Sequence, residues 1–544
     1  MDLERYRDYQ DITTNFRWDI PERYNIAERI LRPWGDHRGR VALFYEDEAG
    51  NRETWTFEQL EQLTNRLANL LRRLGVERGD RVGIILPQCP SAAALHLASY
   101  RLGAVTVPMS MLYGSDSYRY IMNDCGVEVV VVDSAYADKV RRLRAELPML
   151  RQLVVRGEAE DGEVALDEQL SDVDVTCEAV DTKASDPAML LYTSGTTGHP
   201  KGALHAHRIL EGYLLTFQLF FDLHFDQATV FWTPSDWAWV GGLLDNLLPG
   251  LALGYPVLAY NGRFRVEKAY ELMSRYGVTH AFLAPTALKM LAQVERPKER
   301  YDLDVRVIAS GGESVADEVL RWTESELGAV CNEFYGLTEV NHLAGSCARL
   351  WPVRPGSMGL PYPGREVAVL NEEGAPAAVG EIGQIAVRPG DPTMMLGYWR
   401  NPEATAARQR WGWFLTGDLA YRDEEGYIWF KGRNDDMIKS GGYRIGPAEV
   451  EEVLLGHPAV AEVAVVGSPD AVRGQVVKAF IKLSTGHSGS RELIEELQQL
   501  VKERLAAYKY PREVEFVTDL PTTTTGKLNR RQLRLREEER KGER

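Results

Sequence analysis

The chain has 544 residues, of which 44% are hydrophobic and 26% are charged, and its formal charge is −16 at pH 7. This hydrophobic content is enough for sizeable buried cores and excludes a largely disordered chain. The acidic balance argues against general binding to nucleic acid or to anionic membranes.

Five scattered cysteines without a Cys-x-x-Cys pair favour a reduced protein that has neither a disulfide framework nor a zinc site. The first residues lack the apolar core of a secretory signal. The most apolar segment, 241–260, contains Asp245, Asn246 and two prolines, so it predicts a buried helix and strand, not a membrane span. We therefore expect a cytoplasmic protein, either a monomer or a homodimer.

Helical and extended patterns alternate along the first part of the chain. Leucines at helical spacing predict an amphipathic helix over 58–74, which ends at Gly75. Apolar runs predict buried strands, and a helix is expected over 91–100. The expected strands are 81–86, 104–108, 127–132, 279–284 and 305–309. Strands that alternate with helices of this length indicate parallel sheets with crossover helices.

After about residue 352, short β-like pieces with glycine and proline punctuation predict a small β-rich subdomain. From Gly446 a new α/β unit of about 110 residues is expected, of ordinary domain size. Its elements are a helix from Pro447 to Gly456, strands 460–466 and 476–483, a helix over 492–505 and a strand over 513–517. The charged tail 530–544 is expected to be a solvated, frayed end.

The most informative run is Tyr192-Thr-Ser-Gly-Thr-Thr-Gly-His-Pro-Lys-Gly202, directly behind the apolar residues 188–191. Small residues allow backbone N–H groups to turn toward an anion, hydroxyls add donors, and Lys201 adds a point charge. The spacing Gly-x-x-Gly-x-x-Lys-Gly differs from the Walker pattern. A simple turn between two elements is the alternative. His205 and His207, just after the run, are expected to pack on a helix face without a metal or base role.

Four further blocks follow: Tyr335-Gly-Leu-Thr-Glu339, Thr416-Gly-Asp418, residues 432–445, and Pro521-Thr-Thr-Thr-Thr-Gly-Lys527. Together with the run at 192–202 they resemble the signature motifs of the adenylate-forming superfamily, in the family's order. The resemblance is closest to the medium-chain branch of the AMP-forming acyl-CoA synthetases. It implies a large N-terminal lobe of parallel-rich sheets over 1–433, a hinge over 434–436 and a smaller mobile α/β domain over 437–544.

The resemblance implies that ATP and Mg²⁺ bind at these motifs. Glu339 would be the magnesium ligand, and Thr338 beside it would donate to the α-phosphate. Tyr335 would lie against adenine, and Asp418 would accept hydrogen bonds from both ribose hydroxyls. The implied nucleotide-binding set is Thr193, Ser194, Gly195, Thr196, Thr197, Gly198, Lys201, Gly312, Glu313, Glu333, Tyr335, Gly336, Asp418 and Arg433.

Lys527 is the residue expected to carry the first chemical step, because the family lysine at this position bridges the substrate carboxylate and the α-phosphate. Asp435 matches the family's hinge, about which the small domain swings between two reactions. Coenzyme A is the expected second substrate. Residues implied on the coenzyme A side are Ser440, Gly441, Gly442, Arg444, Arg473 and Lys509. For Arg473 and Lys509, solvated surface charges are the alternative.

The acyl pocket is implied to include Trp237, Trp239, Gly311 and Gly336. Acetate-specific relatives carry a tryptophan where this chain has Gly336, so a deeper pocket is expected here. Trp237 would shorten or flatten it, unless this ring belongs to the packed core. A short- or medium-chain or branched acid is the expected substrate. An aryl acid such as benzoate, and transfer to a carrier protein instead of coenzyme A, are the alternatives.

Overall fold

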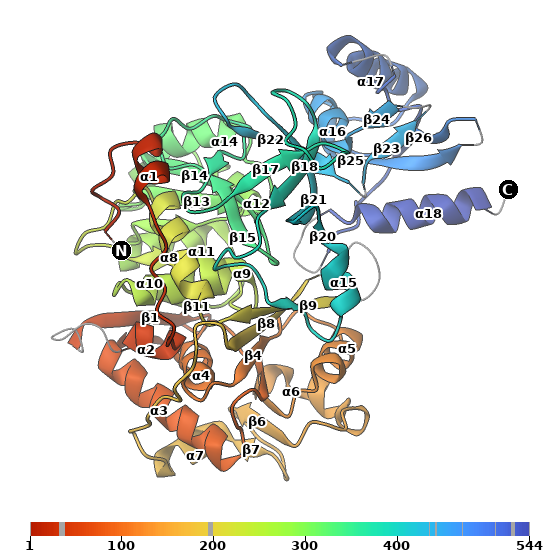
Figure 1. The fold of residues 1–544 in the computed structure, drawn as a ribbon. Coiled ribbons are helices and arrows are strands. Elements are labelled where there is room, and N and C mark those ends of the chain that lie inside the picture. The colour runs from red at the N-terminus through yellow and green to blue at the C-terminus, as the bar shows by residue number, and fades with distance from the viewer. Residues whose placement is uncertain are drawn as a thin grey trace. The chain divides into compact units, whose positions relative to one another are not determined.

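The computed structural model describes residues 2–31, 39–193, 200–434, 436–440, 443–470, 472–505, 508–523 and 528–542. The chain divides into two compact units. The first consists of the chain up to Thr193, of Pro200–Glu366 and of Arg388–Gln409, and the second of Val367–Val387 and Arg410–Arg544. The predicted α/β class is confirmed, since both units combine sheets with helices (Figure 1). The predicted boundary at 434–436 stays a prediction.

The first sheet of the first unit has eight strands among the described residues, in the order β19-β9-β8-β4-β3-β5-β6-β7. These are β3 Arg81–Ile85, β4 Val105–Pro108, β5 Val129–Asp133, β6 Gln152–Arg156, β7 Val164–Ala165, β8 Pro187–Thr193, β9 Lys201–Ala206 and β19 Gly397–Tyr398. Strands β8, β4, β3, β5, β6 and β7 are parallel, and β9 pairs antiparallel with β8 and β19. The parallel strands are buried on both faces, which explains why Val129–Val132 is an unbroken apolar run.

The second sheet has nine strands, in the order β16-β15-β14-β13-β12-β10-β11-β1-β2. These are β1 Val41–Asp47, β2 Arg52–Thr56, β10 Phe231–Trp232, β11 Val257–Asn261, β12 His280–Phe282, β13 Val307–Gly311, β14 Val330–Leu337, β15 Asn341–Gly345 and β16 Leu360–Pro361. From β1 to β14 the neighbours are parallel, while β2, β15 and β16 add antiparallel edges. The predicted strands at 279–284 and 305–309 are confirmed as β12 and β13.

Local signals account for where the helices of this unit begin and end. The predicted helix at 58–74 is α3, and Thr56 and Gln59 form a capping box at its start. Helix α4 begins at Pro90, and α5 ends before Gly126 in the left-handed conformation. The helices are α1 Tyr9–Asn15, α2 Ile26–Leu31, α3 Phe57–Arg73, α4 Pro90–Arg101, α5 Ser115–Cys125, α6 Ser134–Arg141, α7 Leu166–Gln169, α8 Ile209–Phe220, α9 Val240–Gly242, α10 Leu248–Ala252, α11 Val266–Tyr276, α12 Pro285–Leu291, α13 Pro297–Arg300, α14 Asp317–Trp322 and α15 Pro402–Ala407. A π-helical turn, Leu243–Leu247, separates α9 from α10.

The second unit contains the predicted β-rich part and the C-terminal α/β part. The sheet of the former has strands β17 Val367–Leu370, β18 Gly383–Val387, β20 Gln409–Arg410, β21 Trp413–Arg422 and β22 Ile428–Arg433. The other sheet has β23 Ile438–Ser440, β24 Tyr443–Ile445, β25 Val460–Asp470, β26 Gly474–Leu483 and β27 Glu513–Phe516. Helices α16 Pro447–Leu455 and α17 Arg491–Arg504 match the predicted helices, and Val450, Leu497 and Val501 pack with the sheet in one buried cluster.

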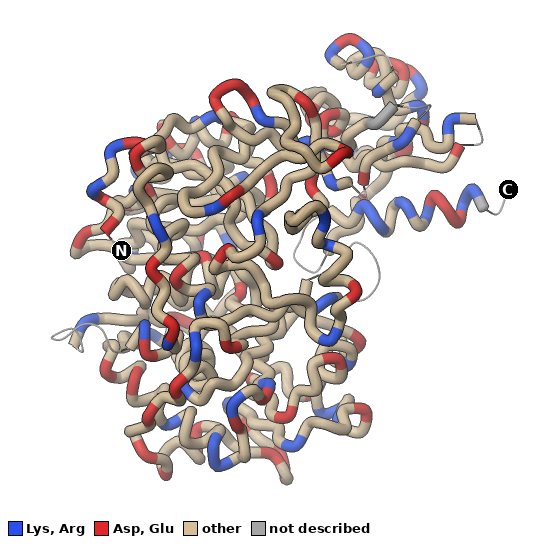
Figure 2. Tube along the Cα trace, in the orientation of Figure 1, with Lys and Arg blue, Asp and Glu red and all other residues tan. Residues whose placement is uncertain are grey.

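The prediction of a frayed tail is wrong for residues 530–542. They form α18 Arg530–Gly542, which appears in Figure 2 as alternating basic and acidic segments. Leu533 packs against Phe480 and its neighbours in a buried cluster. The carboxylate of Glu537 is fully buried and lies 2.7 Å from the ammonium of Lys478. A buried leucine, a buried ion pair and several ion pairs nearer the surface therefore hold a helix whose overall composition is that of a solvated segment.

Candidate active site

The strand order of both sheets of the first unit contains a switch point between two parallel strands. In the first sheet β3 and β5 are neighbours, but the chain continues from β3 to β4 toward one edge of the sheet and from β5 to β6 toward the other edge. In the second sheet the same holds for β10 and β12. In open α/β sheets, ligands bind in the crevice outside the carboxyl ends of strands at such a switch point. The fold thus supplies two candidate crevices, and their positions indicate a binding site.

Hydrogen bonds join the two carboxyl edges to each other. Gln88, which follows β3, donates from Nε2 to the carbonyl oxygens of Thr233 (3.1 Å) and Ser235 (2.7 Å). Its Oε1 accepts a bond from the backbone N–H of Tyr260, 3.0 Å away. Ser110 Oγ, after β4, donates to Asp236 Oδ2 over 2.9 Å. The start of the segment 234–239 is therefore bonded to residues that follow β3 and β4, and β11 is bonded to Gln88.

The two tryptophans expected in the acyl pocket lie in this segment. Trp237 is 2% exposed, and its indole N–H has no hydrogen-bond partner among the described residues. Trp239 is partly buried and meets the ring of Tyr113 edge-on, with centroids 5.6 Å apart. Their roles toward an acyl chain stay predictions.

The glycine-rich run lies between β8 and β9 in the sequence. Thr193 and Lys201 are register partners at the ends of these strands. Five predicted phosphate-binding residues lie outside the described residues. These are Ser194, Gly195, Thr196, Thr197 and Gly198. The ammonium of Lys201 lies 5.4 Å from the centre of the Tyr398 ring, within cation–π range. His205 lies on β9 and His207 just after it, both fully buried, so the expected helix-face position is wrong and the expected packing is right.

Glu339 is the centre of a charged cluster that includes Lys201. The hydroxyl of Tyr398 donates to Glu339 Oε1 over 2.6 Å, and Arg408 Nη2 lies 3.8 Å from the same oxygen. Burial and the charge of Glu339 both raise the pKa of the Tyr398 hydroxyl, so it stays a hydrogen-bond donor at any physiological pH. The backbone oxygen of Glu339 accepts a bond from Met395 N–H, 2.8 Å away. Arg408 thus lies beside the buried carboxylate of Glu339, and Lys201 lies over the ring of the tyrosine that donates to it.

Tyr398 and Arg408 are site residues that sequence reasoning missed. Tyr398 lies 59 positions after Glu339 and is brought beside it by β19, a strand of only two residues that pairs with β9. A two-residue strand leaves no periodicity to detect. Tyr398 pairs in register with Ala203, two residues after Lys201. No pattern in the sequence predicts this pairing.

The predicted nucleotide-binding residues on β13 and β14 lie close together in the sheet. Ser310 pairs in register with Glu333, and Gly311 with Phe334. Glu333 Oε1 accepts a bond from Val315 N–H over 2.8 Å, while Oε2 is buried without a partner among the described residues. Burial raises the pKa of Glu333 to about 7. This carboxyl group can therefore change its charge near neutral pH.

Glycines in this region permit close approach of neighbouring groups. Gly312 has a φ of +94°, which favours glycine, and Glu313 beside it is exposed. A Cβ at Gly311 would lie 2.6 Å from the Phe334 ring. A Cβ at Gly336 would lie 2.3 Å from the carbonyl oxygen of Asn341, across an irregular pairing of β14 with β15. The close approach of two strands thus explains glycine at 336 directly, and the deeper pocket stays a prediction.

Asp418 and Arg433 form the predicted ribose-binding pair in the second unit. They are register partners on β21 and β22, and Arg433 Nη1 lies 3.5 Å from Asp418 Oδ1. The carboxylate of Asp418 is 8% exposed. Within β21, the hydroxyl of Thr416 accepts a bond from Asp418 N–H over 3.1 Å. The sequence block Thr-Gly-Asp therefore presents a buried, oriented carboxylate.

The residues expected to bind coenzyme A are partly described. Lys509 Nζ forms an ion pair of 2.7 Å with Glu449, so part of its charge is already compensated. Arg473 lies in an exposed turn whose N–H groups are bonded to Asp470. Ser440 is buried and pairs in register with Gly474. Several of the predicted residues lie outside the described residues. These are Asp435, Gly441, Gly442 and Lys527, together with the side chain of Arg444.

Two negative findings apply to the described ranges. No group of three or more His, Cys, Asp or Glu side chains there could enclose a metal ion, so Glu339 is a single carboxylate and not part of a protein cage. No described helix is long and apolar enough to cross a membrane.

Comparison with known proteins gives consistent matches along the whole chain. The family model described as AMP-binding enzyme matches residues 32–399, and the model for the AMP-binding enzyme C-terminal domain matches residues 449–527. An uncharacterised acyl-CoA ligase of Bacillus subtilis (strain 168) is 36% identical over 520 residues, which cover 95% of this chain and 97% of the relative. The mitochondrial acyl-coenzyme A synthetase ACSM3 of Mus musculus is 34% identical over 548 residues, covering 98% of this chain and 94% of the relative.

Among solved structures, an anthranilate CoA ligase, AuaEII, in complex with anthranoyl-AMP is similar with a TM-score of 0.86 and 31% sequence identity. The similarity covers 96% of this chain and 99% of that structure. The first family model alone extends over more than half of the chain. The chain belongs to the AMP-binding enzyme family.

Proposed function

We propose that this protein is an AMP-forming acid–CoA ligase. It converts a carboxylate and ATP into acyl-AMP and pyrophosphate, and then transfers the acyl group to coenzyme A with release of AMP. The cluster of Glu339, Tyr398 and Arg408, with Lys201 over the Tyr398 ring, is the observation that carries this proposal, because Lys201 belongs to the phosphate-binding motif.

The first step requires two anions to meet, since the carboxylate attacks the α-phosphate of ATP. Positive charge and fixed orientation are what such a site must supply. Lys201 and Arg408 provide two partly exposed cations next to Tyr398 and Glu339 in an acidic chain. Asp418 and Arg433 would hold the ribose, and Tyr335 the adenine. Lys527 would neutralise the attacking oxygen and the α-phosphate, and movement at Asp435 would exchange it for the coenzyme A side.

The donor chemistry of Glu339 fits Mg²⁺. This ion keeps several waters and is usually bound by one or two carboxylates together with substrate phosphates. A single buried carboxylate, whose Oε1 is held by Tyr398, matches that preference, and the lack of a larger cage among the described residues agrees with it. The bound ion would supply charge neutralisation at the phosphates. Glu339 would hold it, and Tyr398 would orient Glu339.

The acid itself is proposed as a short- or medium-chain or branched carboxylate, in keeping with the similarity to a mitochondrial acyl-coenzyme A synthetase. An aryl acid is the second candidate, which the similarity to an anthranilate CoA ligase supports. Buried Trp237 and the rings around Trp239 are compatible with a flat substrate.

The proposal is tested by measuring pyrophosphate release with ATP and a panel of linear, branched and aryl acids, with and without coenzyme A. We expect one class of acid to give acyl-AMP and pyrophosphate without coenzyme A, and acyl-CoA and AMP when it is added. Transfer only to a carrier protein would contradict the ligase assignment. Absence of pyrophosphate with every acid would contradict acid activation altogether.

A further inference from the structure

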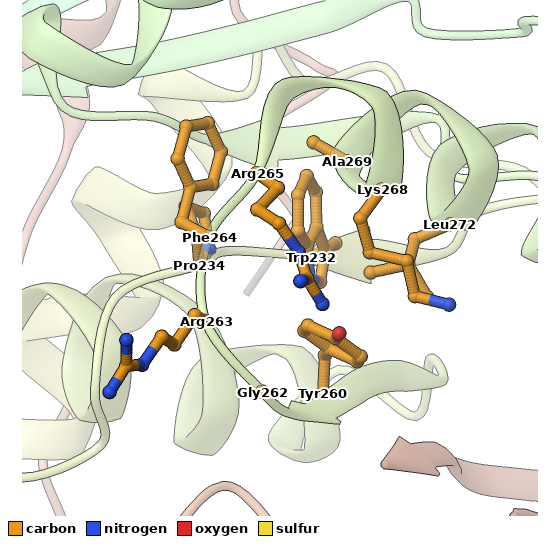
Figure 3. A pocket seen from close by; sticks show the side chains of 10 residues that line it. All are labelled: Trp232, Pro234, Tyr260, Gly262, Arg263, Phe264, Arg265, Lys268, Ala269 and Leu272. Atoms are coloured by element: carbon orange, nitrogen blue, oxygen red, sulfur yellow. The ribbon is translucent and has the colours of Figure 1, made fainter. Parts of the chain in front are cut away.

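A small pocket lies at the carboxyl ends of β10 and β11, next to the crevice described above. Trp232 ends β10, Tyr260 lies near the end of β11, and the loop and helix that follow supply Arg263, Arg265 and Lys268. Figure 3 shows the guanidinium of Arg265 directed toward Tyr260 and Trp232, whereas Arg263 extends to the other side of the loop. The lining of the pocket thus combines three aromatic residues, Trp232, Tyr260 and Phe264, with three basic ones.

Two buried donors on the floor of this pocket have no partner among the described residues. They are the indole N–H of Trp232 and the hydroxyl of Tyr260, in residues that are 1% and 8% exposed. Buried polar groups of this kind normally find a hydrogen-bond partner, so each such group calls for an explanation. The pocket is open on one side and its cavity volume is ≈ 10 Å³, which is room for one water-sized atom. A single oxygen atom of a larger group fits there, whereas an acyl chain or a nucleobase does not.

Positive charge is concentrated around the same pocket. The buried carboxylate of Glu46 pairs with Arg52 (3.1 Å), Lys268 (2.5 Å) and Arg275 (2.9 Å). Arg265 pairs with Glu48 over 3.2 Å, and Lys268 also lies 3.8 Å from Glu271. The pocket itself is lined by three basic residues, Arg263, Arg265 and Lys268, and no carboxylate is among its lining residues.

Arg265 is the cation that is most available to a ligand. Its side chain is 62% exposed and that of Glu48 is 46% exposed, so their ion pair is weak and can be replaced. A guanidinium presents several N–H donors in a fixed fork that matches the oxygens of a phosphate group. A phosphate at the mouth could contact Arg265 and extend one oxygen to the two donors on the floor. This arrangement accounts for the charge, the unpaired donors and the size of the pocket together.

The position of the pocket separates it from the ATP phosphates. Glu339 follows β14, and β13 and β12 lie between β14 and β10 in the sheet order. With strands about 4.8 Å apart, the pocket between β10 and β11 is roughly 15–20 Å away from β14. The compact triphosphate of ATP at Glu339 would not span this distance. Coenzyme A carries its phosphates at the far end of a long pantetheine arm, away from the reacting thiol.

We propose that the pocket formed by Trp232, Tyr260 and Arg265 binds a phosphate group, and that coenzyme A brings it. This inference rests on the proposed acid–CoA ligase activity. It assigns part of coenzyme A recognition to the first unit, apart from Arg473 and Lys509 of the second. Free inorganic phosphate carries the same chemistry, and the experiment separates the two sources.

The test compares the wild type with Arg265→Ala and Tyr260→Phe, using the best acid of the panel. KM is measured for coenzyme A and for dephospho-coenzyme A, which lacks the 3′-phosphate. Arg7→Ala is the matched control, because Arg7 is also an exposed arginine that pairs with a single carboxylate, Asp11. Tyr260→Phe keeps the buried ring and removes only the unpaired hydroxyl.

We expect both pocket variants to raise KM for coenzyme A by about threefold to tenfold, as for one charged contact near the surface. The control keeps its KM. If KM rises for coenzyme A but not for dephospho-coenzyme A, the pocket binds the 3′-phosphate. If KM rises equally for both, the pocket binds the diphosphate. An unchanged KM in both variants overturns the proposal. If inorganic phosphate raises the Tm of the wild type but not of Arg265→Ala while KM is unchanged, free phosphate is the ligand and coenzyme A is excluded.

Pyrophosphate release without coenzyme A is recorded in the same preparations. If it is absent from the wild type, the proposed function has failed, and not the assignment of this pocket. If it is present and equal in all variants, any change in KM for coenzyme A reports on the pocket alone.

Discussion

Replacing Tyr398 by phenylalanine should separate the orientation of Glu339 from the fold around it. The substitution removes the hydroxyl that donates to Glu339 Oε1 over 2.6 Å and keeps the ring beneath Lys201. Tyr398 is 6% exposed, so the remaining ring stays packed. A hydrogen bond to a charged group contributes about 1.5–3 kcal/mol. If that orientation is needed in the transition state of adenylation, its rate should fall by about 10- to 100-fold.

The assay is ATP–pyrophosphate exchange with an accepted acid, titrated with Mg²⁺. We expect a lower maximal rate and a higher Mg²⁺ concentration at half-maximal activity for Tyr398→Phe. Tyr24→Phe is the matched control, because the hydroxyl of Tyr24 donates to a carboxylate oxygen of Glu211 that also contacts Arg29. Tyr24, Arg29 and Glu211 repeat the same kind of contact, with a tyrosine hydroxyl and an arginine on one carboxylate, between the segment around α2 and α8. Tyr24→Phe should therefore change stability and leave the adenylation rate and the Mg²⁺ dependence unchanged. An unchanged rate and Mg²⁺ dependence for Tyr398→Phe would refute the reasoning.

Three further outcomes follow from other groups. Burial raises the pKa of Glu333 from 4.5 to about 7. The contribution of this group to the unfolding free energy is therefore complete below pH 4.5 and is lost as the pH rises through 7, a fall of about 3 kcal/mol. Glu333→Gln should flatten the profile of denaturation midpoint against pH. Hydrogen bonds from Lys478 and its neighbours outweigh burial and lower the pKa of Glu537 below 4.5, so this stabilisation is present above pH 4.5 and is lost as the pH falls through the lower value. Lys478→Met should leave a buried carboxylate unpaired, cost about 3–5 kcal/mol, and speed hydrogen exchange in α18; equal exchange in variant and wild type would contradict this. Asp418→Asn should raise KM for ATP by about 10-fold or more with an unchanged Tm, and an unchanged KM would remove Asp418 from the nucleotide site.

The fold was predictable wherever one strand or helix carries its own pattern. The valines of β5 mark a strand buried on both faces, and the leucines of α3 with the cap at Thr56 mark a helix. Helix α18 was not predictable in this way, because its composition is that of a solvated segment. Its docking depends on Leu533 and on the ion pair of Glu537, which exist only when the sheet is present.

The candidate site shows the same division. Glu339, Asp418 and Lys201 stand in compact motifs, so their residue types and spacing are enough to indicate phosphate and nucleotide chemistry. Tyr398 and Gln88 act through pairings between distant segments: one donates to a carboxylate 59 positions away, and the other joins the carboxyl edges of two sheets. Contacts of this kind depend on strand order, which periodicity does not reveal.

The path of the oxygen atom tests the central claim most directly. An accepted acid labelled with ¹⁸O in its carboxylate is incubated with ATP and coenzyme A, and AMP is analysed by mass spectrometry. Attack of the carboxylate on the α-phosphate, followed by cleavage of the acyl–oxygen bond by the thiol, predicts one ¹⁸O atom in each AMP. AMP without the label, or label recovered in inorganic phosphate together with ADP, would contradict activation through an acyl-adenylate.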